Sequence, residues 1–113
     1  MRTLIVAKIQ PGSAPDIARI FADSDATSLP HDLGVAERSL YALDDLYVHL
    51  IDFRADGAQA MSELHTHQGF RDISERLARH VSPYRPAWRS PQDAIADRFY
   101  HWQATTIERQ ENS

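Results

Sequence analysis

The first part of the chain changes from a strand-like to a helix-like spacing of apolar residues. Residues 3–9 are mostly β-branched or aliphatic and are followed by Pro11-Gly12, which predicts a strand that stops there. Beyond it, apolar residues recur three and four positions apart, which is the spacing of one helix face. Ser13 and Asp16 form a capping-box pattern at the start of this predicted helix, which should end near residues 24–25.

The rest of the chain predicts three more strands and a divided helical region. Two strand-like segments flank Asp44-Asp45, a pair that suits a two-residue hairpin turn. Apolar spacing then becomes helical twice, and a final segment alternates aromatic and polar residues as a strand does. The predicted strands are 34–43, 46–53 and 95–103, and the helical segments are 58–64 and 70–77.

The order of these elements is β-α-β-β-α-β, which is the ferredoxin-like split βαβ pattern. It predicts an α+β fold in which helices cover one face of a four-stranded antiparallel sheet. The chain has 113 residues, enough for one domain and too few for two. We therefore expect residues 1–113 to form a single domain.

Both faces of the strand at 46–53 are largely apolar, although a sheet with one face in water should alternate apolar and polar residues. The helices can cover only one of these faces. We expect a second copy of the chain to cover the other, giving a homodimer of the α/β-barrel type in which two sheets enclose a barrel-like interior. The alternative is that the C-terminal loop carrying Tyr84 and Trp88 folds over the open face.

A two-residue turn at 44–45 would also fix the register of the hairpin. Arg38 and His49 would then be diagonal neighbours at a spacing of ~7–8 Å. An arginine and a histidine among apolar side chains are costly to bury without partners, and a ligand cavity would explain both. The residues predicted to share this face are Arg38, Leu40, Tyr47, His49 and Ile51.

Three residues are candidates for chemistry, and each has a structural alternative. His49 can transfer a proton near neutral pH, or it can be a neutral, hydrogen-bonded wall residue. Arg38 can stabilise an enolate or bind a phenolate, or it can form an ion pair with an acidic residue on a neighbouring strand. Asp25, just past the predicted helix, can act as a base or orient a histidine, or it can form a turn.

Aromatic and histidine residues elsewhere carry weaker signals. Trp88, Tyr100 and Trp102 can line a cavity that stacks on planar rings, or they can be ordinary core residues. His65 and His67 form an H-x-H pattern in helical surroundings, where alternate positions do not share a face. We therefore expect no metal site.

Composition removes several classes of function. There is no cysteine, so disulfides, thiol nucleophiles and zinc–thiolate sites are excluded. The formal charge is −4 and Lys8 is the only lysine among twelve basic residues, which argues against a nucleic-acid partner. No apolar run approaches the ~20 residues of a membrane span, and the N-terminal sequence is unlike a signal peptide, so we expect a cytoplasmic protein without a membrane partner. Nucleotide-binding and serine-hydrolase motifs are also absent.

Several segments resemble the tetracenomycin-type aromatic polyketide cyclase family. They are the stretch DATSLP at 25–30, Arg38 following Gly34-Val35, and the run DLYVHLI at 45–51, which is the most specific part. The similarity runs over roughly residues 4–102. Further matches are His67 with Phe70, Glu75-Arg76, Ser82-Pro83-Tyr84, Trp88 and Phe99-Tyr100-His101-Trp102.

The resemblance implies a dimeric ferredoxin-like fold without a cofactor, and a cavity between the sheet and its helices or C-terminal segment. It implies ring closure of a poly-β-ketone by aldol condensation and dehydration. Its polar site groups fall on His49, Arg38 and Asp25. On this basis we expect His49 to shuttle the proton, Arg38 to stabilise oxyanion character, and Asp25 to orient or assist. Members often carry a histidine where this chain has Ser24, so a mechanism that needs two histidines is not carried over. Further substrate contacts are expected from Tyr47, Ile51, His67, Trp88, Tyr100 and Trp102.

Two other functions fit the same sequence. One is a cofactor-free monooxygenase that oxidises an anthrone-like polyphenol, and the other is a non-catalytic polyketide-binding partner of a synthase complex. The expected partners are an aromatic polyketide intermediate, free or tethered to a carrier protein, a second copy of the chain, and a type II polyketide synthase. Chain length and the ring that closes are not predicted.

Overall fold

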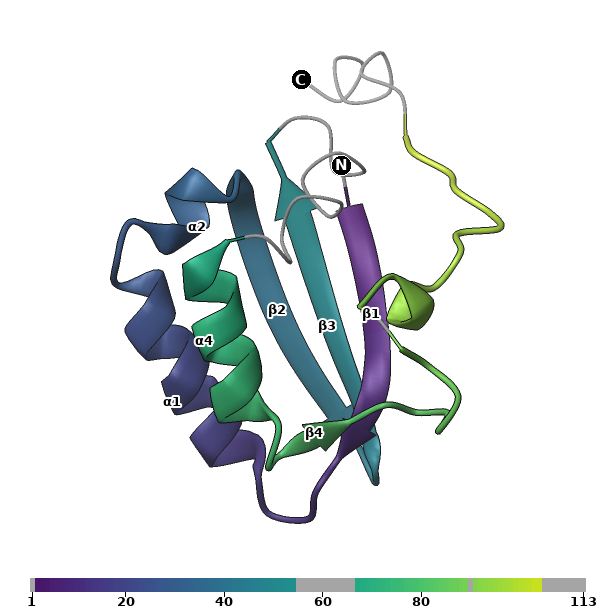
Figure 1. Ribbon diagram of the computed structural model, residues 1–113. Helices are drawn as coiled ribbons and strands as arrows, with labels where there is room; N and C mark the ends of the chain where they lie inside the picture. The colour runs from purple at the N-terminus through teal and green to yellow at the C-terminus, as the bar shows by residue number, and fades with distance from the viewer. Residues whose placement is uncertain (1, 55–66, 90, 105–113) are drawn as a thin grey trace.

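The computed structural model describes residues 2–54, 67–89 and 91–104, which form an antiparallel sheet with helices packed on one side (Figure 1). The strands are β1 (Arg2–Ile9), β2 (Val35–Leu43), β3 (Leu46–Phe53) and β4 (Val81–Ser82). The helices are α1 (Ala14–Asp25), α2 (Leu29–Asp32), α4 (Gln68–Leu77) and the short 3₁₀ helix η1 (Pro91–Ala94). None of the helices in these ranges is long and apolar enough to cross a membrane.

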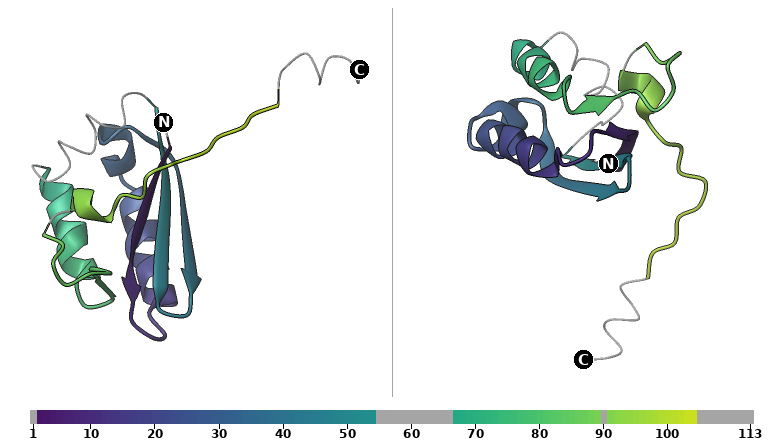
Figure 2. Two further views of the ribbon diagram at one scale, coloured as in Figure 1. Left: turned by 90° about the vertical axis from the view of Figure 1, so that its right-hand side faces the viewer. Right: turned by 90° about the horizontal axis from the view of Figure 1, so that it is seen from below.

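The strand order is β2-β3-β1-β4, and every neighbouring pair is antiparallel. Helices α1 and α4 lie side by side across one face of this sheet (Figure 2). This order and layering confirm the predicted α+β fold of the ferredoxin-like type. The helix-covered face is called the inner face below, and the opposite one the outer face.

The β2–β3 hairpin has the predicted two-residue turn. Leu43 pairs with Leu46, and Leu40 pairs with His49. Asp44 takes a positive φ of 53°, a conformation that aspartate adopts more readily than most residues. The register therefore puts the predicted residues on the inner face, where alternate positions of β3 are buried: Tyr47, His49, Ile51 and Phe53.

The hydrophobic core lies between the inner face and α1. The apolar stripe predicted for the first helix is buried on α1, where Ile17 is the most deeply buried side chain. Ile73 of α4 packs into the same cluster, while Val35, Ile51 and Phe53 form a second cluster at the other end of the sheet. The remaining members of the first cluster are Ala7, Ile9, Ile20, Phe21 and Tyr47.

The outer face is apolar in its middle, with the charged residues Lys8, Glu37 and Asp52 toward its ends, and no helix in the described part of the chain covers it (Figure 2). Its strand positions include the half-buried residues Leu4, Val6, Val48 and Leu50 and the exposed residues Tyr41 and Leu43. The loop with Tyr84 and Trp88 does not fold over this face, because Trp88 lines a cavity on the inner side. That alternative from the sequence is therefore wrong.

The fourth strand of the sheet is β4 and not the predicted segment 95–103. Only the start of that segment joins β1, through a single bridge between Ile5 and Ile95 and a bond from the Ala96 N–H to the Leu4 carbonyl. Residues 96–104 then run away from the body of the domain (Figure 2). β4 pairs with Lys8 and Ile9 at this same edge of β1, and beyond Ile95 the tail pairs with no strand of the described residues.

Two local predictions at the helices have different outcomes. Ser13 precedes α1 but makes no capping bond, because its Oγ lies 2.9 Å from His80 Nδ1 and Asp16 bonds to Arg19 instead. A tertiary contact has replaced the predicted capping box. The helix predicted at 70–77 is α4, and the one predicted at 58–64 lies outside the described residues.

Candidate active site

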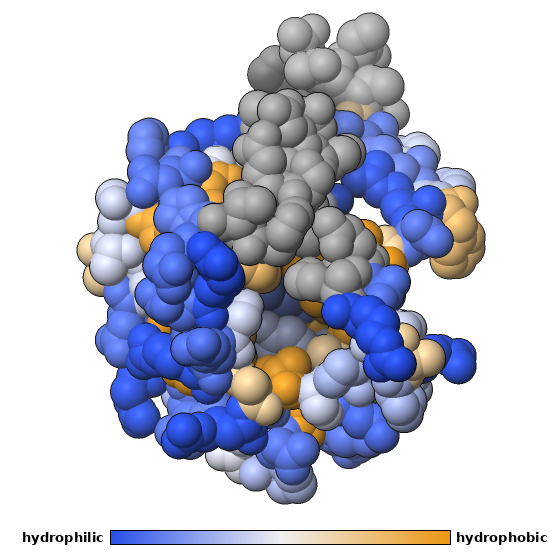
Figure 3. Space-filling view, in the orientation of Figure 1, coloured by the Kyte–Doolittle hydropathy of each residue, from blue (hydrophilic) through white to orange (hydrophobic). Residues whose placement is uncertain are grey.

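A cavity of about 410 Å³ lies between the inner face of the sheet and helices α1 and α4. A space-filling view shows a hollow in this part of the molecule, with hydrophobic side chains inside it (Figure 3). Phe21 of α1, Phe70 and Ile73 of α4, and Ile51 and Phe53 of β3 supply much of the apolar wall. Arg38, Tyr47 and His49 form a polar cluster on the sheet side. Such a cavity suits an apolar ligand held by a few polar contacts.

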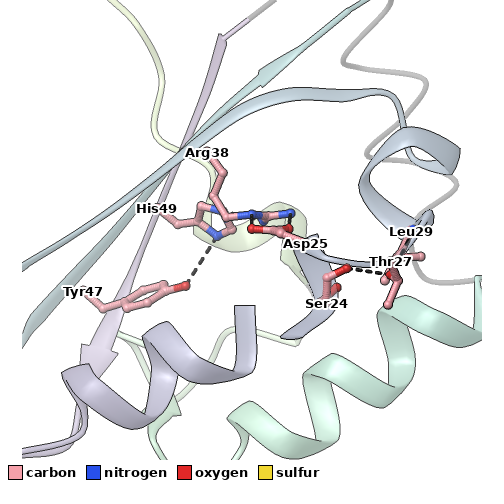
Figure 4. A network of polar contacts seen from close by, with 7 residues as sticks. All are labelled: Ser24, Asp25, Thr27, Leu29, Arg38, Tyr47 and His49. Atoms are coloured by element: carbon pink, nitrogen blue, oxygen red, sulfur yellow. Dashed lines mark hydrogen bonds and ion pairs between the residues drawn. The ribbon is translucent and has the colours of Figure 1, made fainter. Parts of the chain in front are cut away.

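Arg38 is held in place by a two-point ion pair with Asp25. Arg38 Nε donates to Asp25 Oδ2 at 3.1 Å, and Arg38 Nη2 donates to Asp25 Oδ1 at 3.0 Å (Figure 4). The partner therefore comes from the end of α1 and not from a neighbouring strand. The guanidinium also lies 4.7 Å from the centroid of the Phe21 ring. Two parallel charge-assisted bonds fix both the position and the plane of the guanidinium.

His49 joins Arg38 to Tyr47 across the inner face (Figure 4). Its Nε2 lies 3.0 Å from Arg38 Nη1, and its Nδ1 lies 3.4 Å from the Tyr47 hydroxyl. The residue is only 6% exposed, and the edge of its ring meets Phe21 at a centroid distance of 5.1 Å. Burial, helped by the nearby Arg38 charge, lowers the pKa of His49 from 6.5 to about 3. His49 is therefore neutral at physiological pH.

The last turn of α1 carries Asp25 and an unusual buried hydroxyl, and the loop that follows it is tied back to this turn. Thr27 Oγ1 donates to the Ser24 carbonyl at 2.6 Å and accepts from the Leu29 N–H at 3.1 Å, which links the end of α1 to the start of α2 (Figure 4). Ser24 is buried, and its Oγ has no hydrogen-bond partner among the described residues. An unpaired buried hydroxyl is a cost to stability.

The other residues expected to contact substrate divide into two groups. Ile51 and Trp88 line the cavity together with Tyr47. His67 does not line it, because it forms the N-cap of α4, where its Nδ1 accepts from the Gly69 N–H at 3.1 Å. Tyr100 and Trp102 lie on the projecting tail, 75% and 68% exposed, and are not part of the cavity wall. The structure thus gathers three of the six at one site.

Sequence reasoning missed most of the cavity wall, including Phe21, Phe70 and Arg89. Phe21 and Phe70 have helical spacing, which by itself indicates only a core position. Arg89 lines the cavity from the loop after β4, and no motif marks it. A helix that faces a cavity and one that faces a packed core have the same apolar pattern, so only the tertiary arrangement separates them.

Comparison with known proteins places this geometry in a family. Residues 1–103 match the family model described as polyketide synthesis cyclase. The chain is 46% identical over 101 residues to a protein of Streptomyces cyaneus named polyketide synthase CurG, covering 88% of this chain and 94% of that one. It is 51% identical over 105 residues to an uncharacterised protein of Streptomyces coelicolor, covering 91% of this chain and 95% of that one.

A relative with a solved structure gives the same answer. Tetracenomycin F2 cyclase of Streptomyces glaucescens is 35% identical over 103 residues, covering 91% of this chain and 94% of that protein. Its structure, described as that of a type-II polyketide cyclase, superposes with a TM-score of 0.86 at 34% identity and covers 93% of this chain and 99% of that one. Sequence and fold agree over nearly the whole chain, and the protein therefore belongs to the tetracenomycin-type polyketide cyclase family.

Proposed function

We propose that this protein closes a ring of an aromatic polyketide by aldol condensation and dehydration. The observation that carries the proposal is the position of Arg38, which Asp25 holds beside Tyr47 and His49 on the sheet side of a largely apolar cavity. A poly-β-ketone would place its carbon chain against the apolar wall and one carbonyl oxygen near this cluster. Membership of the polyketide cyclase family supports the same substrate class.

The proposed reaction is balanced without an added oxidant or reductant. A methylene carbon between two carbonyls loses a proton to water, that carbon bonds to a distant carbonyl carbon as the C=O π bond of that carbonyl opens, and its oxygen takes a proton from water. Loss of water then leads to the aromatic ring. Holding the two reacting carbons together can supply about 7–11 kcal/mol in favourable cases, so the shape of the cavity carries much of the catalysis.

The polar residues would contribute through charge and orientation. Arg38 stabilises the negative charge that develops on oxygen, and Asp25 orients Arg38. The idea that His49 shuttles the proton meets an obstacle, because its Nε2 faces the Arg38 guanidinium and its pKa is lowered to about 3. In this arrangement His49 is a weak base whose ring nitrogen is already engaged.

Two further parts of the proposal concern partners. A second copy of the chain covers the apolar outer face, and this is supported by the exposure of Tyr41 and Leu43 there and of Phe99 on the tail. Substrate contacts from Tyr100 and Trp102 require the tail to lie against a cavity, which it does not reach in its own chain. The substrate itself arrives free or tethered to the carrier protein of a type II synthase.

The test is a reconstitution with a matched polyketide synthase, with and without the protein. The wild-type protein should shift the products toward one ring pattern, and Arg38→Met should abolish that shift. Arg76→Met is the matched control, because Arg76 is an exposed arginine of α4 that pairs with Asp23 at 3.5 Å and does not line the cavity. Identical products with and without wild-type protein would refute the proposed function.

A further inference from the structure

The hydrogen bonds on the inner face have a direction that Arg38 alone determines. A guanidinium carries only donors, so the 3.0 Å contact between Arg38 Nη1 and His49 Nε2 requires Nε2 to be the acceptor. Nε2 therefore carries no proton. In a neutral imidazole the single ring proton must then lie on Nδ1.

The proton on Nδ1 faces the hydroxyl of Tyr47. The two heavy atoms are 3.4 Å apart, a long and weak hydrogen bond in which Tyr47 Oη is the acceptor. Deep burial of both side chains agrees with a neutral ring, since it lowers the pKa of His49 and raises the pKa of Tyr47. The phenol keeps its proton and cannot act as a base at physiological pH.

This leaves the O–H of Tyr47 as the free end of the chain. The bonds run one way, from Arg38 to His49 and from His49 to Tyr47, so the last donor has no acceptor left within the cluster. Among the described residues the hydroxyl has no second partner, and Tyr47 lines the cavity. A buried donor without an acceptor costs free energy until a ligand supplies one. Aligned bonds also polarise one another, which strengthens the terminal donor.

We propose that the Tyr47 hydroxyl donates a hydrogen bond to the reacting carbonyl oxygen of the substrate, and that His49 is the positioning residue that aims it. The inference rests on the proposed function, because it needs a substrate oxygen that gains negative charge. Tyr47 and Arg38 lie on opposite sides of the His49 ring, so each serves a different substrate oxygen: Tyr47 the carbonyl that is attacked, and Arg38 the enolate oxygen. Both residues keep their protons throughout, so the protein lends donors to these oxygens and holds no proton in transit.

The first test is Tyr47→Phe, which keeps the ring in the core and removes only the hydroxyl. Removing one donor to an oxyanion costs about 10²–10³ in kcat where it has been measured, and we expect a loss of at least about tenfold here with KM changed by less than about threefold. Tyr84→Phe is the matched control, since Tyr84 is 44% exposed and does not line the cavity. Tyr47→Phe at wild-type rate would overturn the inference while leaving the proposed function intact.

The role of His49 is tested by rescue with a conservative variant. His49→Gln has a carboxamide oxygen that can accept from Arg38 but has no basic nitrogen, whereas His49→Ala has neither. A positioning role predicts that the Gln variant keeps clearly more activity than the Ala variant and loses less than Tyr47→Phe. Equal and complete loss in both variants would assign the proton to His49 and overturn the inference.

The closing experiment needs neither substrate nor variant. Long-range proton–nitrogen NMR of the histidine rings in the folded wild-type protein distinguishes a protonated from an unprotonated ring nitrogen. We expect His49 to be neutral at pH 7, with its proton on Nδ1 and Nε2 bare. A proton on Nε2 would reverse the chain and overturn the inference. Failure of the proposed function would appear separately, as a wild-type protein that leaves the polyketide products unchanged.

Discussion

Acid should destabilise this protein through His49, and the size of the effect follows from its burial. The pKa of His49 is lowered from 6.5 to about 3, first by burial and then by the charge of Arg38. Below pH 6.5 the unfolded chain therefore binds a proton at this position that the folded chain does not. The stability that His49 contributes is complete above about pH 6.5 and is lost as the pH falls toward about 3.

The expected loss can be worked out for a convenient pH. One pKa unit corresponds to about 1.4 kcal/mol, so lowering the pH from about 7.5 to about 4.5 should cost on the order of 2–3 kcal/mol. That is a large part of the roughly 5–15 kcal/mol by which a domain is stable. The groups that face the ring are Arg38 and Tyr47 from the sheet and Asp25 through Arg38.

The assay is urea unfolding of the wild type and of His49→Gln at about pH 7.5 and about pH 4.5. For each protein the free energy of unfolding at the lower pH is subtracted from that at the higher pH, and the two differences are compared. Carboxylates and the other histidines titrate in both proteins, so the comparison isolates His49. The wild type should lose on the order of 2–3 kcal/mol more than the variant over this interval. Equal losses of unfolding free energy in the two proteins would refute the claim that His49 is buried and resists protonation.

Three other changes have expected outcomes. Asp25→Asn removes the charge that orients Arg38 and should lower kcat by about tenfold or more in the reconstituted assay, whereas an unchanged rate would remove Asp25 from the site. Ser24→Ala deletes a buried hydroxyl without a described partner and should raise the free energy of unfolding by about 1 kcal/mol, measured by urea unfolding. A lower free energy of unfolding in the variant would contradict this. Val48→Asp places a charge on the outer face and should turn a dimer into a monomer by light scattering, while a wild-type protein that is already monomeric would contradict the proposed dimer.

The sequence predicted the hairpin and its inner face well, because one local feature determines both. A two-residue turn at 44–45 fixes the pairing of Leu43 with Leu46, and the two-residue period of a strand then assigns every side chain to a face. Arg38 and His49 were expected as neighbours on this basis. The same register also placed Tyr47 and Ile51 on the face of the sheet that lines the cavity.

The remaining features depend on contacts between distant segments. Asp25 could be read as a turn former, and only the packing of α1 against the sheet brings it to Arg38. Ser13 has the sequence of a cap, but the distant His80 engages its hydroxyl. The tail at 96–104 alternates like a strand, but it has no partner strand among the residues that the structure describes. Local patterns cannot show whether the partner that they need is present.

The most direct measurement of the central claim is the mass of the product made by wild-type protein and a matched polyketide in the presence of labelled dioxygen. Aldol closure and dehydration predict a product that has lost water and carries no oxygen from the label. A product that has gained labelled oxygen would identify an oxygenase in this cavity and would contradict the account. A bound but unchanged polyketide would contradict it equally, by identifying a carrier.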